Sequence, residues 1–173
     1  MKAIVTGHSR GLGAAIAETL LARGIAVLGL ARHGNAGLVA ACPQLFHERA
    51  IDLSDVAALQ SWLGGDDLRL FLAGCTSILL INNAGTVQPV GAVGSADNAA
   101  IASALNINVA TPLILANAVI AVAAEVPEKR ILHVSSGAAR SPYPGWSVYC
   151  ASKAALDQHA RSVALDRVPG VRI

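Results

Sequence analysis

The segment from Lys2 to Leu20 constrains the fold of this chain more than any other feature. An apolar run, Ala3-Ile4-Val5, leads into Thr6-Gly7-His8-Ser9-Arg10-Gly11-Leu12-Gly13, and apolar residues at helical spacing follow. Glycines let the backbone approach a ligand closely, and the first free N–H groups of a helix attract phosphate. A strand, a glycine turn and a helix in this order predict a pyrophosphate site. The spacing is GxxxGxG rather than the common GxGxxG, and a glycine-rich turn without a ligand is the alternative.

Strand-like and helix-like segments alternate along the whole chain. The expected strands are 2–6, 25–30, 45–51, 77–82, 130–135 and 171–173. The expected helices are 11–23, 35–41, 55–63, 96–125 with breaks, and 147–167. Near-continuous apolar runs such as Ile78-Leu79-Leu80-Ile81 are typical of parallel strands that are covered on both faces. Together these patterns predict one dinucleotide-binding domain, residues 1–173, with a doubly wound parallel sheet of the Rossmann type.

Tyr149 and Lys153 are the residues whose spacing points to chemistry. They lie four positions apart, so in a helix both side chains project from one face. A positive charge beside a phenol favours its ionised form, and such a pair can deliver a proton near neutral pH. The spacing YxxxK also occurs by chance on solvated helices, so taken alone it favours the solvated interpretation.

Four motifs together change that balance. Thr6-Gly7 to Gly13, Asn82-Asn83-Ala84-Gly85, Ser136 and the Tyr149/Lys153 pair resemble the motifs of the short-chain dehydrogenase/reductase family. Their order and separations match, including thirteen residues from Ser136 to Tyr149, and the resemblance spans essentially the whole chain. The segment 145–155 is further similar to the tyrosine helix of sepiapterin reductases and benzil reductases. The resemblance implies reduction of a ketone or α-dicarbonyl by a nicotinamide cofactor.

The resemblance also implies catalytic roles. Ser136 hydrogen-bonds the substrate carbonyl, Tyr149 gives a proton to its oxygen, and Lys153 assists the tyrosine and holds the nicotinamide ribose. Asn108 helps to hold a water relay to the lysine. Two neighbours compete for these assignments, namely Ser135 and Asn106.

Ser136 is preferred over Ser135 because the family places the second serine in the site, and adjacent residues of a strand face opposite sides. The alternative for Ser136 is a hydroxyl that satisfies the start of a turn. Asn108 is preferred over Asn106 because Val109-Ala110-Thr111 fits the family pattern. Trp146 either lines a pocket for a flat or dicarbonyl substrate or simply packs.

Charge after the second strand predicts the cofactor. Leu30-Ala31-Arg32-His33 contains no acid, and Arg10 lies in the glycine turn, so Arg32 and Arg10 could flank the 2′-phosphate of NADP. Two solvated arginines are the alternative. By resemblance, Asp52 meets the adenine amino group, although a helix cap is also open to it. The predicted cofactor-binding residues are Gly7, Ser9, Arg10, Gly11, Leu12, Gly13, Arg32, Asp52, Leu53, Asn83, Ala84, Gly85, Tyr149 and Lys153.

Composition restricts the partners. The formal charge of +2 and the lack of a basic run argue against nucleic acid, and the histidines and cysteines have no metal-ligand spacing. The chain has an odd number of cysteines, Cys42, Cys75 and Cys150, without redox spacing, which predicts reduced thiols and a cytoplasmic location. The apolar stretch 109–126 could span a membrane by length, but Pro112 and Asn117 interrupt it, so we expect a helix buried on most sides. The resemblance implies a small-molecule carbonyl substrate and a homodimer or homotetramer.

Two expectations concern the limits of this assignment. Val171-Arg172-Ile173 looks like the opening of a sixth strand, and family members continue with a substrate-covering segment, so we expect the natural chain to be longer. A degenerate minimal form of the fold is the alternative. The alternative function is a catalytically silent dinucleotide-binding sensor or interaction protein. An intact set of Ser136, Tyr149 and Lys153 argues against it, because a binder needs no proton donor.

Overall fold

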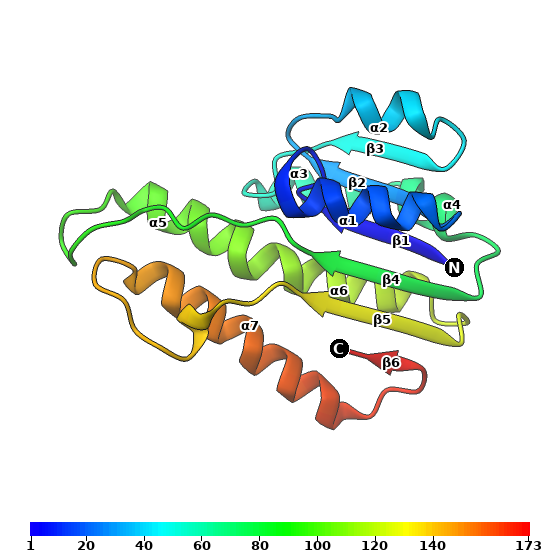
Figure 1. Cartoon of the computed structure of the whole chain (residues 1–173). Coiled ribbons are helices and arrows are strands. Elements are labelled where there is room, and N and C mark those ends of the chain that lie inside the picture. The colour runs from blue at the N-terminus through cyan, green and yellow to red at the C-terminus, as the bar shows by residue number, and fades with distance from the viewer.

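The computed structural model describes all 173 residues and contains a six-stranded parallel sheet (Figure 1). The strands are β1 (Lys2–Thr6), β2 (Ala26–Ala31), β3 (Phe46–Ala50), β4 (Ser77–Asn82), β5 (Glu128–His133) and β6 (Val171–Arg172). Their order in the sheet is β3-β2-β1-β4-β5-β6, and all neighbouring pairs are parallel. The predicted Rossmann-type sheet is therefore confirmed.

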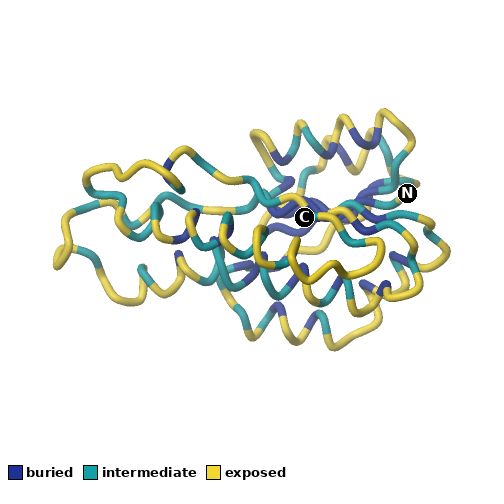
Figure 2. The backbone as a smooth tube through the Cα atoms, turned by 90° about the horizontal axis from the view of Figure 1, so that it is seen from below, coloured by how far each residue is buried: buried dark blue, intermediate teal, exposed yellow.

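Helices cover both faces of this sheet. One apolar cluster joins the strands to α1 (Gly11–Ala22) and α2 (Ala36–Ala41), and the other joins them to α3 (Val56–Leu63), α4 (Asp67–Leu72) and α6 (Thr111–Val122). Strand β1 contributes to both, since Ala3 and Val5 belong to the first cluster and Ile4 to the second, all fully buried. Figure 2 shows this buried band between more exposed helices. The short helix α4 was not predicted, because its apolar residues repeat over little more than one turn.

A long helical segment follows β4. It consists of α5 (Asn98–Leu105), the π-helical turn η1 (Asn106–Ala110) and α6. The segment Asn98–Val122 is long and apolar enough to cross a membrane, and 33% of its most apolar window is buried. One such helix is weak evidence for a membrane span, because core helices share these properties. The stretch 109–126 is less buried than the sequence predicted, since Asn117 is exposed and Val122 is 42% exposed.

The remaining elements are η2 (Gly137–Ala139), a 3₁₀ turn after β5, and α7 (Ser147–Asp166). Helix α7 packs against α5, η1 and β5. All strands point the same way, so the residues that follow β1 to β5 gather at one edge of the sheet. The glycine turn, Arg32, Asp52, Asn83 and Ser136 all come after strands at this edge.

Candidate active site

The glycine turn packs tightly against the end of β4. Gly7 has a φ of +71°, which favours glycine, and a Cβ on Gly13 would overlap the Gly7 carbonyl oxygen. The Thr6 hydroxyl accepts hydrogen bonds from the backbone N–H groups of Asn83 and Ala84, both at 2.9 Å. These contacts hold the turn and the Asn83–Gly85 segment next to each other.

A groove of about 760 Å³ runs along this edge of the sheet. It extends between the glycine turn, the segment after β2 and the segment after β4. Of the predicted cofactor residues it is lined by Gly7, Ser9, Arg10, Gly11, Arg32, Leu53, Asn83, Ala84 and Gly85. The other five lie elsewhere: Leu12 is 57% exposed, Gly13 is buried beneath the turn, and Asp52, Tyr149 and Lys153 do not line this groove. The open groove and the free backbone at Gly11, where a Cβ would meet nothing within 4 Å, fit an extended dinucleotide.

Asp52 lies beside this groove, in a smaller pocket of about 300 Å³ that it shares with Arg32. Its carboxylate accepts from the Ser54 backbone N–H at 2.9 Å and from the Ser54 hydroxyl at 2.7 Å. The bond from that N–H lowers the pKa of Asp52 against the opposing effect of burial, and the Ser54 hydroxyl and the charge of Arg32 add to the decrease. Asp55, and not Asp52, caps helix α3, because it accepts from the Ala58 N–H. Asp52 therefore stays charged and is free of the capping role.

The π-helical turn gives its two asparagines different environments. Asn108 is 1% exposed; its Oδ1 accepts from the Thr86 N–H at 2.8 Å, and its Nδ2 donates to the Thr86 carbonyl at 2.8 Å and to Ser152 Oγ at 3.1 Å. Asn106 instead donates to the Ser54 carbonyl at 3.0 Å. Turns of this kind inside α-helices occur frequently at functional sites. Asn108 is the asparagine that lies next to the tyrosine helix.

Lys153 and Tyr149 meet at the same place. Lys153 is 5% exposed, donates to the Val134 carbonyl at 2.8 Å, and lies 5.7 Å from the centre of the Tyr149 ring. Burial lowers the pKa of Lys153, and the carboxylate of Asp157 opposes this shift. A Cβ on Gly85 would lie 2.9 Å from Asn108 Oδ1 and 3.7 Å from Lys153 Nζ, so these three residues converge.

The two serines after β5 make different contacts. Ser136 Oγ accepts from the Ala138 N–H at 3.2 Å and thereby caps η2, which leaves its hydroxyl proton free to donate. Ser135 Oγ donates to the carboxylate of Asp157 on α7. The contact of Ser136 is the one expected for a turn-starting hydroxyl, and it is compatible with a further bond to a carbonyl oxygen.

Three aromatic rings form a row beside this centre. The ring centres of Trp146 and Tyr149 are 5.6 Å apart and nearly perpendicular, and those of Tyr143 and Trp146 are 5.3 Å apart. Tyr143 is 47% exposed, so the row leads from the surface to the proposed proton donor. Such a row offers flat apolar faces to an aromatic ligand.

A family model described as short chain dehydrogenase matches residues 1–173. The chain belongs to the short-chain dehydrogenase/reductase family. Benzil reductase ((S)-benzoin forming) of Bacillus cereus is 34% identical over 171 residues, which cover 95% of this chain and 68% of that protein. Sepiapterin reductase of Meriones unguiculatus is 33% identical over 184 residues, with 98% of this chain and 70% of that protein covered. The chain thus spans about two thirds of the length of these relatives.

Solved structures of family members superpose closely on this chain. A short-chain dehydrogenase/reductase from Burkholderia vietnamiensis is 53% identical and has a TM-score of 0.97; the match covers 99% of this chain and 80% of that one. A short-chain dehydrogenase from Streptomyces avermitilis is 31% identical with a TM-score of 0.85, covering 99% and 62%. The glycine turn and the α7 centre, which is the place where Asn108, Tyr149 and Lys153 converge, therefore lie within a short-chain dehydrogenase fold.

In this short-chain dehydrogenase, several residues at the site were not predicted from the sequence. Thr86 and Ser152 hold Asn108, and Thr6 joins the glycine turn to β4. Another row of polar side chains joins β4, β5 and α7. His133 of β5 contacts Asn82 Nδ2 and His159 Nδ1, both at 3.1 Å. The histidines have no sequence signal for this pairing, because β5 and α7 bring them together only in the fold.

We expect the short-chain dehydrogenase to lose stability in mild acid, because His133 is partly buried next to His159. Burial, aided by the charges of His159 and Lys153, lowers the pKa of His133 from 6.5 to about 4. The unfolded chain therefore takes up a proton below pH 6.5 that the folded protein does not accept until about pH 4. Unfolding free energy should fall across this window by on the order of 2 kcal/mol at this half-buried site.

Urea unfolding at a series of pH values measures this effect. We expect His133→Asn to lose much of the decrease between pH 6.5 and 4, because asparagine does not titrate. An equally steep decrease in this variant would show that other groups cause the acid sensitivity.

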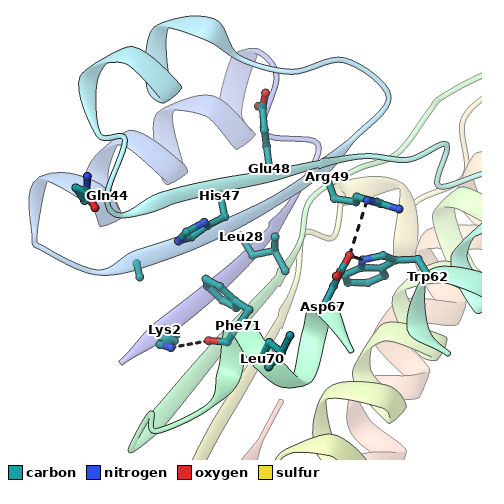
Figure 3. Close-up of a pocket in the computed structure, with 11 residues that line it drawn as sticks. Lys2, Leu28, Gln44, His47, Glu48, Arg49, Trp62, Asp67, Leu70 and Phe71 are labelled. Atoms are coloured by element: carbon teal, nitrogen blue, oxygen red, sulfur yellow. Dashed lines mark hydrogen bonds and ion pairs between the residues drawn. The ribbon is translucent and has the colours of Figure 1, made fainter. Parts of the chain in front are cut away.

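The short-chain dehydrogenase has a further pocket, of about 590 Å³, at a different place (Figure 3). Its lining includes Lys2 at the start of β1, Ala26 at the start of β2, and Phe71 of α4. None of the predicted site residues lines it. Because strand starts and strand ends lie at opposite edges of a parallel sheet, this pocket is separate from the α7 centre.

Proposed function

We propose that the protein is an NADPH-dependent carbonyl reductase that transfers hydride to a ketone or α-dicarbonyl, with Tyr149 as proton donor. One observation carries this proposal. Tyr149 and Lys153 lie together on α7, and the lysine converges with Asn108 and Gly85, which itself lines the glycine-turn groove. The similarity to benzil reductases and sepiapterin reductases supports a carbonyl substrate.

The groove residues would hold the cofactor. Backbone N–H groups at the start of α1 would face the pyrophosphate, and Arg10 and Arg32 would face the 2′-phosphate from two sides. Asp52, which is kept charged by its bonds to Ser54, would accept from the adenine amino group. When bound, NADPH supplies the hydride that reduces the carbonyl carbon.

Side chains of the protein would bind the carbonyl oxygen and supply its proton. Ser136 has a free hydroxyl proton and would donate it in a hydrogen bond to that oxygen, which polarises the carbonyl. Tyr149 would give its phenolic proton to the same oxygen as negative charge develops there. The ammonium of Lys153 would stabilise the resulting phenolate, since it lies against the tyrosine ring.

The aromatic row suggests the substrate class. Tyr143, Trp146 and Tyr149 place three rings next to one another beside the proposed reacting position, inclined by 42° and 87°, and the phenyl groups of a diketone such as benzil would pack against them. We therefore place α-dicarbonyl compounds with an aromatic substituent first among the substrates of this reductase.

The assembly and location are also part of the proposal. Leu105 of α5, Val122 of α6 and Leu165 of α7 are 39%, 42% and 79% exposed, and a second copy packed on these helices would cover them in a homodimer or homotetramer. Light scattering of the purified protein tests this. Cys42, Cys75 and Cys150 are free thiols, which fits the reducing cytoplasm.

The preference for NADPH can be tested with Arg32→Ala. We expect KM for NADPH to rise about tenfold, because one charge-assisted contact to the 2′-phosphate is lost. KM for NADH should change little, and kcat should be retained. Arg49→Ala is the control, since Arg49 lies on β3 outside the groove, and its exposed pairing with Asp67 is 3.8 Å long. A wild-type KM for NADH at or below that for NADPH would contradict the cofactor assignment.

A further inference from the structure

The carboxylate of Glu48 connects the two walls of the glycine-turn groove. One wall is the glycine turn, and the other is the loop between β2 and α2. Glu48 on β3 lies opposite His47 and Arg49 in the strand alternation, and Figure 3 shows its side chain turned away from His47 and Phe71. Glu48 Oε2 contacts His8 Nε2 at 3.1 Å and accepts from the Asn35 backbone N–H at 2.9 Å. His8 belongs to the glycine turn, and Asn35 to the loop between β2 and α2.

His8 is fixed in place by its surroundings. It is fully buried, its ring centre lies 5.4 Å from that of Phe46 in an edge-to-face arrangement, and a Cβ on Gly29 would lie 2.5 Å from the ring. Its Nδ1 has no hydrogen-bond partner. A proton on this buried Nδ1 would be unpaired and costly, so the ring proton belongs on Nε2. His8 therefore donates to Glu48, and the carboxylate receives hydrogen bonds from both walls.

The loop between β2 and α2 also packs closely against Glu48. A Cβ on Gly34 would overlap Glu48 Oε1, so this loop lies directly against the carboxylate. Asn35 also caps α2 by accepting from the Leu38 N–H at 3.1 Å, and its Nδ2 approaches the Ser9 carbonyl at 3.5 Å. Arg32, His33 and Gly34 of the same loop face Ser9 and Arg10 across the groove.

We propose that Glu48 is a positioning residue that holds the β2–α2 loop against the glycine turn and thereby sets the pocket for the 2′-phosphate of the cofactor. This inference rests on the proposed NADPH preference. Glu48 does not line the groove, so it acts through Arg10 and Arg32. Its negative charge alone would repel a phosphate, so positioning and charge predict opposite effects when the side chain is removed.

Calorimetric binding of two probes separates these effects. Adenosine 2′,5′-bisphosphate carries the 2′-phosphate, and adenosine 5′-monophosphate lacks it. We expect Glu48→Ala to weaken bisphosphate binding about tenfold and monophosphate binding about twofold at most, because two hydrogen bonds are lost between the walls. Glu48→Gln removes the charge but keeps an acceptor of the same length, and it should stay within about threefold of wild type. Glu18→Ala, an exposed acid on α1, controls for net charge.

Hydrogen exchange of the unliganded protein provides a second readout. The Asn35 amide should exchange faster in Glu48→Ala than in wild type, while amides of the central strand β1 should be unchanged. This measurement also shows whether the variant is folded. It does not depend on cofactor binding or on activity.

The outcomes distinguish this inference from the proposed function. Equal affinity of the wild-type protein for the two nucleotides would overturn the NADPH preference. A wild-type preference that is retained or strengthened in Glu48→Ala would overturn only the role of Glu48, because charge would then outweigh positioning. An Asn35 amide that exchanges in Glu48→Ala at the wild-type rate would also overturn the positioning role of Glu48.

Discussion

Replacing Tyr149 by phenylalanine is expected to lower kcat by about 10²- to 10⁴-fold, the range for loss of a positioned general acid. The substitution removes one oxygen and keeps the ring, so the contacts with Trp146 and Lys153 remain. Affinity for NADPH should change little, since the groove that would hold most of the cofactor is unaltered. Steady-state rates with a diketone and fluorescence titration with NADPH measure the two quantities.

Tyr143→Phe is the matched control for this experiment. Tyr143 lies in the same aromatic row and loses the same hydroxyl group, but it is half exposed and separated from Tyr149 by Trp146. Its kcat should stay within about threefold of wild type, because no proton is transferred from it. Full activity of Tyr149→Phe, or an equal loss in Tyr143→Phe, would show that Tyr149 is not the proton donor.

Replacing Lys153 by methionine is expected to lower kcat/KM by at least about 10²-fold and also to weaken NADPH binding. Methionine has a similar length, so packing is largely kept while the charge and the donor to the Val134 carbonyl are lost. The proton donor would then lack its neighbouring positive charge, and the nicotinamide ribose would lack its ammonium partner. The joint effect on rate and cofactor affinity distinguishes Lys153 from Tyr149.

Lys129→Met provides the matched control at the other end of β5. Lys129 is 4% exposed and donates to the carbonyls of Ala123, Ala124 and Val126, so it too is a buried lysine held by backbone. Its loss should lower the unfolding free energy by about 2 kcal/mol, because buried carbonyls lose their donor, and leave kcat intact. If both variants lose stability equally and neither loses rate, Lys153 is only structural.

The fold was predictable because its signals are local and repeat along the chain. Runs such as Ile78–Ile81 are typical of strands covered on both faces, and the glycine turn indicates where the first strand ends and the first helix begins. Boundaries were less certain: β5 begins at Glu128, two residues before the expected start, because its first residues are charged and carry no strand signal.

Residues of the candidate site were predicted only where a motif specifies them. The choice of Asn108 over Asn106 came from family resemblance, and periodicity alone could not have made it, because the π-helical turn changes the register of the helix. Glu48 and His133 had no motif at all. Each acquires its environment from residues far away in the sequence, His8 and Asn35 for the first and His159 for the second.

The most direct test is to follow the transferred hydrogen. The purified protein is incubated with benzil and NADPH that carries deuterium at the transferable position of the nicotinamide, and the product is analysed by mass spectrometry and NMR. We expect a hydroxyketone with one deuterium on the carbinol carbon, formed in wild type and Tyr143→Phe and nearly abolished in Tyr149→Phe. Tight NADPH binding without any labelled alcohol across a panel of ketones and diketones would contradict carbonyl reduction and favour a silent dinucleotide-binding protein.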